Sequence, residues 1–304
     1  MQTLKRMRFS QIKHSTFDQV FYLANNFFLL LYVVICLYPL VYVLSSSFSS
    51  PTAVLTGKVR LWPVDFGVKG YITVFKNSSI YTGYMNSFIY TIIGTTLNVL
   101  MTLLAAYPLS RKELVGRTWI SLILAFTMWF NGGMIPTYLL MKNLNLLNTR
   151  AAMWFPGMVS VWNVIITRTF FQNTIPEELY ESASLDGCTY RLYFFYVVLP
   201  LSGAILAVVS LFSAVGHWNA YFNAFLYLNN EKLYPLQVVL RNILLQNAVT
   251  TDALVGLRSD ASEAGLQELL KYSLIIVACV PVWCAYPFVQ KFFVKGVMVG
   301  SIKG

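Results

Sequence analysis

The sequence predicts an all-α membrane protein with six transmembrane helices. Only 11% of its 304 residues are charged and the mean hydropathy is +0.61, whereas about a quarter of the residues of a soluble domain are charged. Long stretches also lack Asp, Glu, Lys and Arg altogether, and a helix needs about 20 mainly apolar residues to cross a bilayer. The charge-free stretches are 19–57, 77–110, 118–141, 151–167, 192–230 and 272–290.

Each charge-free stretch supplies one predicted span. The first is too long for the apolar core of a cleaved signal peptide. The fourth reaches spanning length only with flanking residues. The predicted helices cover residues 21–47, 85–108, 118–141, 151–172, 200–224 and 272–293.

Helix breakers interrupt several of these spans. Pro39 lies in the first, WFNGGMIP (129–136) in the third, FPG (155–157) in the fourth, and Pro281 and Pro287 in the sixth. Single prolines are common packing kinks, but non-helical backbone at membrane depth needs protein or a water-filled cavity to satisfy its polar groups. The cluster at 129–136 therefore favours a transport pathway.

Basic residues set the predicted orientation, because cytoplasmic segments carry an excess of Lys and Arg. With six spans both termini lie on one side. We expect a cytoplasmic N-terminal segment at 1–20, a six-helix domain at 21–300 and a cytoplasmic tail end at 301–304, with long external segments at 50–84 and 225–271. The basic residues that indicate this orientation are Lys5, Arg6, Arg8, Lys13, Arg111, Lys112, Arg117, Lys291, Lys295 and Lys303. The net charge of +10 then indicates contact with anionic lipid head groups rather than with nucleic acid.

Residues that carry enzyme chemistry are scarce. Cys36, Cys188, Cys279 and Cys284 show no CxxC spacing and no neighbouring histidines, so neither a disulfide framework nor a metal site is expected. The chain has two histidines, no HExxH, no GxSxG and no phosphate loop of the form GxxxxGK(S/T). We therefore predict no catalytic residue and no cofactor bound by this chain. The lack of acidic residues within the spans argues against an ion-coupled transporter.

Aromatic and amide side chains occur together in three spans. Each amide is costly against lipid and should face the bundle interior, where ring faces can stack on sugars and amides can bond to hydroxyl groups. For any one pair, an interhelical contact or an interfacial anchor is an equally good explanation. The predicted substrate-path residues are Trp129, Asn131, Asn163, Trp218, Asn219 and Asn223.

The most polar interruption of the chain is the segment 174–200, which lies on the cytoplasmic side in this topology. Thr174 and Glu177 have the spacing of a capping box, and Gly187 is suited to end a helix in the left-handed conformation. A second helical run then leads into the fifth span. The segment therefore predicts two short helices at an angle on the inner membrane surface.

This segment closely resembles the signature loop of the permease subunits of bacterial ABC importers. That signature is Glu-Ala-Ala, three residues, Gly, nine residues, an aliphatic residue, one residue and Leu-Pro. Every spacing is kept, with Ser in place of one Ala and Val in place of Ile. The matching residues are Glu181, Ser182, Ala183, Gly187, Val197, Leu199 and Pro200. The stretches 131–149, 215–229 and 291–304 are similar to the carbohydrate branch, above all to permeases for complex oligosaccharides, including uronic-acid-containing fragments.

The resemblance implies the type I ABC importer permease fold with cytoplasmic coupling helices, in the smaller, maltose-permease-like subunit of a permease heterodimer. The implied partners are a second permease subunit, an ABC ATPase dimer that uses ATP and Mg, an oligosaccharide, and an extracytoplasmic solute-binding protein that contacts 225–271. The tail at 295–304 would reach the ATPase, and the complex would lie in the bacterial cytoplasmic membrane. The residues implied to couple to the ATPase are Glu178, Glu181, Ala183, Asp186, Gly187, Tyr190, Leu199 and Pro200.

Other interpretations stay open at the level of sequence. A permease for an amino acid or a metal ion is the nearest alternative within the ABC class, and a secondary transporter lies outside it. The aromatic and amide pairs favour sugar over a metal ion. Whether the sugar is a uronic-acid oligosaccharide or a neutral one, and whether this subunit contacts it directly, is left open.

Overall fold

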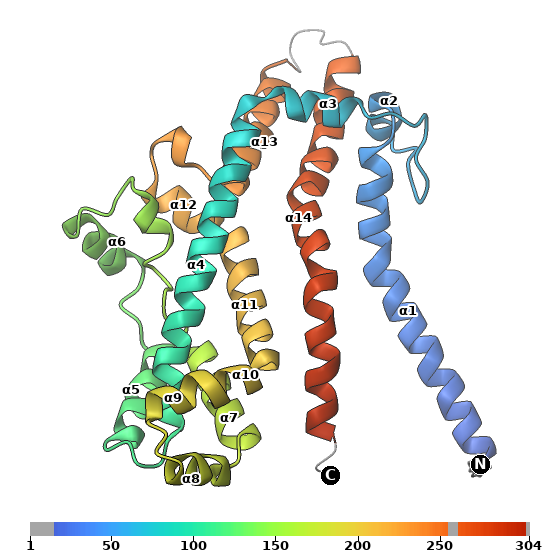
Figure 1. The fold of residues 1–304 in the computed structure, drawn as a ribbon. Helices are drawn as coiled ribbons and strands as arrows, with labels where there is room; N and C mark the ends of the chain where they lie inside the picture. The colour runs from blue at the N-terminus through green and yellow to red at the C-terminus, as the bar shows by residue number, and fades with distance from the viewer. Residues whose placement is uncertain (1–14, 255–260, 302–304) are drawn as a thin grey trace, which may run out of the picture. The chain divides into compact units, whose positions relative to one another are not determined.

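The computed structural model describes residues 15–254 and 261–301, and every regular element within those ranges is a helix (Figure 1). The chain divides into two compact parts, which are described separately. One comes from Met1–Gly70 and Asp260–Ser273 and the other from Tyr71–Ser259 and Leu274–Gly304, in each case as far as the chain is described. The prediction of an all-α protein is confirmed for this part of the chain.

The first part is built on α1 (Thr16–Ser47). The last turn of α1 is buried, and the hydroxyl of Ser45 donates to the carbonyl oxygen of Leu61 over 2.7 Å. The rest of α1 exposes its apolar side chains, as a helix in contact with lipid or another protein does. α2 (Pro51–Leu55) packs with the start of α14 (Ala261–Ser301). Their shared core consists of Ala53, Val54, Val59 and Leu269.

The second part is organised around α4 (Ser78–Ser110), a helix of 33 residues. It packs against α7 (Val161–Thr174), α11 (Gly203–Trp218) and α13 (Leu236–Leu254) (Figure 1). These contacts run from one end of α4 to the other. The helix is therefore the element through which the two ends of this part are connected.

The other helices of the described chain are short. They are α3 (Lys69–Lys76), α5 (Arg117–Trp129), α6 (Met134–Asn143), η1 (Arg150–Met153), α8 (Glu177–Leu185), α9 (Tyr190–Tyr193), the π-helical turn η2 (Phe194–Val198), α10 (Leu199–Leu201), α12 (Tyr221–Tyr227) and η3 (Glu231–Leu233).

Three described helices are long and apolar enough to cross a membrane without interruption: α1, α4 and the segment Ala264–Pro287 of α14. They contain the first and second predicted spans and most of the sixth, and each helix extends beyond the predicted bounds. Two further spans are possible where short helices form bent pairs. α5 and α6 meet at 110°, and Tyr190–Leu201 and α11 meet at 79°.

The breaks in the bent pairs have local causes. In the third predicted span, 118–141, Gly133 adopts φ +81° and its N–H donates to the side-chain oxygen of Asn131 over 2.9 Å. The predicted interruption there is confirmed. The fifth predicted span, 200–224, is too long, because the chain bends at Ser202 and α11 ends at Trp218.

The fourth predicted span, 151–172, is wrong in its first half. Gly157 adopts φ +86° and follows Pro156, so the α-helix begins only after the cap at Ser160. The resulting helix α7 has 14 residues, a length of about 21 Å that falls short of the roughly 30 Å hydrocarbon core. Helix α7 therefore cannot cross a bilayer alone.

Gly94 permits a close approach of α4 to α11, since a Cβ at this position would lie 2.5 Å from the His217 ring. We expect Gly94→Ala to lower the free energy of unfolding by about 1–3 kcal/mol, because the ring must shift in a packed interface. Thermal unfolding of the detergent-solubilised protein measures the loss. Gly216→Ala on α11 is the matched control, because no atom of another described element lies within 4 Å of its Cβ position. We expect it to be neutral or stabilising, and equal losses in both variants would contradict the packing explanation.

Candidate functional site

The segment predicted to couple to a partner folds into short helices. α8 ends at Asp186, and Gly187 follows with φ +79° and donates its N–H to the carbonyl oxygen of Ser184 over 3.0 Å. This is the left-handed glycine that the sequence predicts. The second helical run, from Tyr190 to Leu201, then leads to α11.

The predicted capping box at the start of α8 is wrong. Thr174 is the last residue of α7. The N-cap of α8 is Pro176, whose side chain has no atom that can accept a hydrogen bond. Instead, the carboxylate of Glu177 pairs with the ammonium group of Lys112, with 2.5 Å between the nitrogen and the oxygen. The start of α8 is thereby connected to the loop that follows α4.

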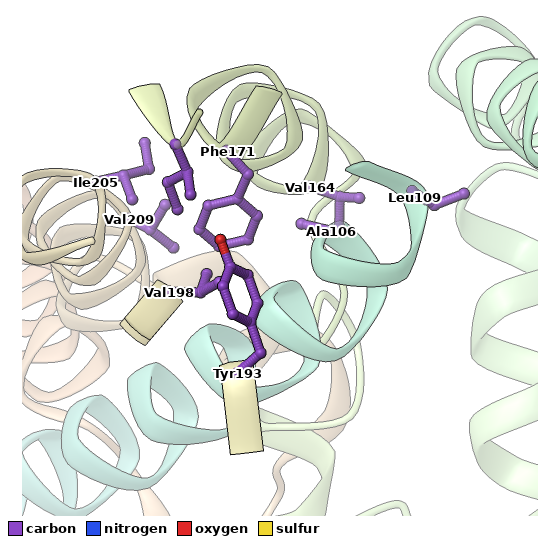
Figure 2. Close-up of a cluster of buried hydrophobic side chains, with 9 residues drawn as sticks. Ala106, Leu109, Val164, Phe171, Tyr193, Val198, Ile205 and Val209 are labelled. Carbon is purple, nitrogen blue, oxygen red and sulfur yellow. The ribbon is translucent and has the colours of Figure 1, made fainter. Parts of the chain in front are cut away.

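A buried cluster anchors the segment 174–200 to the helices around it (Figure 2). Tyr193 and Val198 come from the segment itself and are almost completely inaccessible to solvent. The other members lie on α4, α7 and α11 or directly follow α7. They are Ala106, Leu109, Val164, Phe171, Ile175, Ile205 and Val209. The segment is therefore packed against all three helices in an interior that has few voids.

Arg111, at the end of α4, is surrounded by three tyrosine rings. Its guanidinium carbon lies 5.3 Å from the ring centre of Tyr107, 4.7 Å from that of Tyr180 and 4.8 Å from that of Tyr193. Such cation–π contacts reach about 2 kcal/mol where the groups are partly desolvated. The rings belong to α4, α8 and α9, so one cation joins the end of α4 to both short helices.

The predicted coupling residue Tyr190 takes part in the same arrangement. Its ring stacks on that of Tyr180 with 5.1 Å between the centres, and its carbonyl oxygen accepts a hydrogen bond from the Tyr107 hydroxyl over 3.2 Å. A hydrogen bond with Tyr190 raises the pKa of Tyr180 to about 12. The phenol is therefore protonated at neutral pH and does not place a negative charge beside Arg111.

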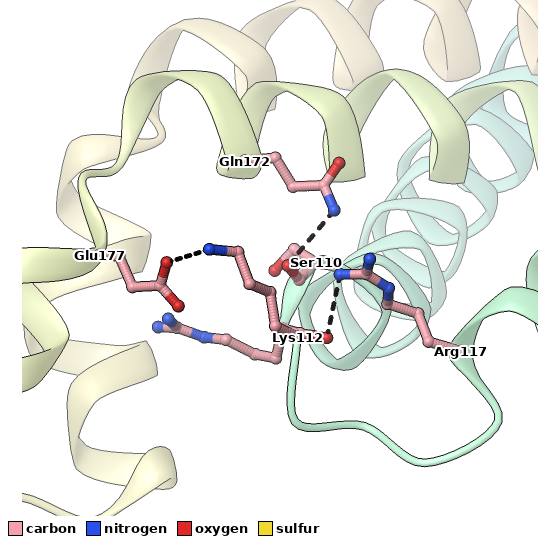
Figure 3. A network of polar contacts seen from close by, with 6 residues as sticks. Ser110, Lys112, Arg117, Gln172 and Glu177 are labelled. Atoms are coloured by element: carbon pink, nitrogen blue, oxygen red, sulfur yellow. Dashed lines mark hydrogen bonds and ion pairs between the residues drawn. The ribbon is translucent and has the colours of Figure 1, made fainter.

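Polar contacts complete the connection between α4, α7 and α8 (Figure 3). The side-chain amide of Gln172, near the end of α7, donates to the carbonyl oxygen of Ser110 over 3.4 Å. Hydrogen bonding to Glu177 raises the pKa of Lys112 above its ordinary value, so this lysine stays cationic. The pair is solvent-exposed and adds little to stability by itself. A cavity of about 430 Å³ lies between these elements.

The solvent-facing residues of α8 and the turn at Gly187, together called the tip of α8, form the most exposed part of this region. Glu178, Glu181, Asp186 and Gly187 all face solvent, and Leu185 is 89% exposed. Ala183, by contrast, packs against the buried cluster. The exposed surface of α8 therefore combines acidic side chains with one apolar side chain. Sequence analysis missed Leu185, although an apolar residue directly before Asp-Gly was a visible signal.

Leu199 and Pro200 lie at the other end of the segment, in α10. The N–H of Leu199 donates to the carbonyl oxygen of Phe194, five residues earlier, which makes η2 a π-helical turn. Pro200 has no N–H and cannot continue the ladder. The Leu-Pro of the signature therefore sits where the chain leaves the short helices, and the next residues bend it into α11.

A polar cluster lies further along α4, beside the broken fourth span. The amide nitrogen of Asn98 donates to the carbonyl oxygens of Gly157 over 3.0 Å and Met158 over 3.3 Å. Its amide oxygen accepts from Ser213 over 2.7 Å and from Asn163 over 3.1 Å. These bonds satisfy the non-helical backbone before α7, as membrane depth would require.

This cluster borders a cavity of about 410 Å³. Asn163 and Asn223, both predicted path residues, line it together with His217, Ser160 and Trp162. Asn98, Ser213 and His217 were not among the predicted path residues. Their common cavity depends on three helices meeting, which no spacing along the chain reveals.

The other predicted path residues lie elsewhere. Trp218 and Asn219 line a second cavity, of about 560 Å³. Trp129 is 81% exposed at the end of α5, and the side chain of Asn131 is occupied by the turn at Gly133. Neither of the last two lines either cavity. The structure thus brings the predicted residues together in two places rather than in one.

The described part of the chain contains no candidate metal site. No three His, Cys, Asp or Glu side chains gather there as metal ligands, and the four cysteines are unpaired.

Replacement of Arg111 tests whether its contacts with the three tyrosine rings hold α8 and α9 in place. We expect Arg111→Gln to lower the free energy of unfolding by about 1–2 kcal/mol and to speed amide hydrogen exchange across 177–193. Mass spectrometry of the solubilised protein measures the exchange. Lys112→Gln removes a neighbouring charge from an exposed ion pair and should leave the exchange nearly unchanged. Equal acceleration in both variants would show that net charge, not the tyrosine cage, holds the helices.

Comparison with known proteins identifies the family to which this chain belongs. No family model matches the chain. The polygalacturonan/rhamnogalacturonan transport system permease YtcP of Bacillus subtilis is 40% identical over 298 residues, which is 96% of this chain and 100% of that protein. Protein LplC of the same organism is 36% identical, covering 94% and 96%. A solved chain of a bacterial ABC transporter that imports the acidic polysaccharide alginate is 33% identical with a TM-score of 0.81, covering 92% of this chain and 99% of that one. The chain belongs to the family of permease subunits of carbohydrate ABC importers.

Proposed function

We propose that the chain forms, with a second permease subunit, the pathway by which an acidic oligosaccharide crosses a bacterial cytoplasmic membrane, driven by a separate ABC ATPase dimer. The observation that carries the proposal is the exposed tip of α8, fixed to α4 by the Arg111 cage and the buried cluster. A rigid, acidic tip with one protruding leucine is suited to a cleft in a partner protein.

The two ends of α4 support the proposed topology. Arg111 and Lys112 contact Tyr180 and Glu177 of α8, whereas Ser87 accepts the first N–H of α13 over 2.8 Å. At 1.5 Å per residue these sites are separated by roughly 35 Å, close to the thickness of a bilayer. α8 would then face the cytoplasm and α13 the outside, where a solute-binding protein docks.

Six crossings follow if the short helix α7 is counted with the loop before it. Three continuous helices and two bent pairs make five. The sixth would consist of α7 and residues 154–160, whose backbone Asn98 satisfies at Gly157 and Met158. Non-helical chain at membrane depth is acceptable there because it is buried in protein and borders a cavity.

Coupling would work through rigid displacement. ATP and Mg would be bound by the partner ATPase, since this chain has no phosphate loop. Closure of the ATPase would move α8, and the cluster around Tyr193 and Val198 would pass the movement to α4, α7 and α11. The cavity lined by Asn163 and Asn223 lies among helices of this group. The predicted tail contact at 295–304 falls largely on side chains outside the described residues.

The substrate class rests on two relatives and on the cavities. YtcP is named for polygalacturonan and rhamnogalacturonan, and the solved neighbour for the acidic polysaccharide alginate. Among the described residues, no acidic side chain lines the cavity at Trp218 or the cavity at Asn163. An anionic sugar would therefore meet no repulsion there. We infer an oligosaccharide that contains uronic acid.

Disruption of the α8 tip should abolish uptake. We expect Glu181→Lys, Gly187→Asp or Leu185→Asp to reduce substrate-driven ATP hydrolysis and uptake at least tenfold, because each alters the surface that enters the ATPase. The solute-binding protein should keep its ligand affinity. Val115→Asp changes an equally exposed apolar residue in the loop after α4 and is the matched control. Full transport by all three α8 variants would contradict the docking role.

Purification tests the assembly and the substrate together. A tag on this chain should retain an ABC ATPase and a second permease from the native membrane. In proteoliposomes with the binding protein, the complex should import trigalacturonate when ATP is supplied on the α8 side. Import of neutral oligosaccharides alone would overturn the proposed substrate class, and a transport-competent homomer would overturn the proposed assembly.

A further inference from the structure

A cavity of about 560 Å³ lies between α11, α12, α13 and α14. The described residues that line it are mainly apolar and aromatic, and one of them is charged. Its volume lies within the range of about 300–1,000 Å³ that is usual for ligand sites. The side chains with a specific chemistry are Trp218, Asn219, Tyr221, Gln237, Arg241 and Trp283.

Arg241 is held in place without neutralisation of its charge. Its guanidinium carbon lies 5.3 Å from the ring centre of Tyr221 and 4.8 Å from that of Phe225, and these two rings stack on each other. Within the described chain the guanidinium has neither a carboxylate within salt-bridge distance nor a hydrogen-bond acceptor. Contact through the ring faces leaves the N–H edge of the guanidinium available, and that edge binds a carboxylate in bidentate fashion.

The two tryptophans that line the cavity differ in their exposure to solvent. Trp218 is only 5% exposed, and its indole N–H donates to the carbonyl oxygen of Ala278 over 3.1 Å, so it forms a fixed wall. Trp283 is 47% exposed and offers its ring to the cavity. Sugar rings stack on such faces through their apolar side, while Asn219 and Gln237 can bond to hydroxyl groups.

We propose that this cavity is a uronate-binding subsite at the end of α4 opposite α8, in which Arg241 pairs with the sugar carboxylate. The inference rests on the proposed function, because it assumes an acidic oligosaccharide. It makes Arg241 a specificity-determining residue of the permease itself, at the point where sugar leaves the binding protein. A neutral sugar gains only the stacking and the amide contacts there.

The test is uptake of trigalacturonate and of its methyl ester, which is neutral, by the complete complex in proteoliposomes. We expect Arg241→Gln to lower the maximal rate for the acid about tenfold, which corresponds to the loss of one charge-assisted bond. Arg241→Lys, which keeps the charge, should retain at least half of the rate. Uptake of the ester and stimulated ATP hydrolysis should stay within about twofold in both variants. Lys232→Gln is the matched control, because it removes an exposed charge that does not line the cavity.

Several outcomes would overturn the subsite. Unchanged acid uptake in Arg241→Gln would remove Arg241 from recognition. An equal fall for acid and ester, or a fall in ATP hydrolysis, would assign Arg241 to packing or to pairing with an acidic side chain of a partner subunit. Failure of the unaltered complex to import trigalacturonate is a separate result and would overturn the proposed substrate class.

Discussion

The requirement that every backbone polar group be satisfied away from water governs this chain more than any other constraint. α4 meets that requirement for its neighbours at three levels. Asn86 and Tyr90 donate to carbonyl oxygens at 232–234, Asn98 to those at 157–158, and Tyr107 to that of Tyr190. Three segments, far apart in the sequence, are thereby attached to one helix.

This arrangement explains why the irregular segments coincide with the candidate sites. A regular helix satisfies its own backbone and needs no partner, whereas a break creates free carbonyl groups that can only be placed beside donors or water. The break before α7 borders the cavity lined by Asn163, and the turn at Gly187 forms the exposed tip of α8. The break before α7 supplies shape and polarity that a straight helix lacks, and Asn98 of α4 supplies the hydrogen bonds that satisfy it.

The sequence carried some of these features and not others. Charge-free stretches predicted most spans because apolarity is a local property, and Gly187 predicted its own conformation because only glycine adopts positive φ at little cost. The capping box failed because Thr174 belongs to the end of α7 and Pro176 takes the N-cap position of α8. The Arg111 cage depends on three tyrosines from separate helices. No spacing along the chain contains that information, since it arises only when α8 and α9 fold back on α4.

The same contacts suit α4 to the proposed role of connecting the ATPase-docking helix α8 with the region around α13. Arg111 and the buried cluster fix the short helices to one end of α4, while Ser87 and Asn86 fix the chain around α13 to the other. A helix of 33 residues bonded at both ends is stiff along its axis, so a tilt imposed at one end moves both attachments together. The polar cluster at Asn98 lies between them, where a tilt changes the spacing of α4 from α7 and α11. Under the proposed function, coupling would therefore need no flexible relay; it would need α4 to remain rigid and its neighbours to remain bonded to it.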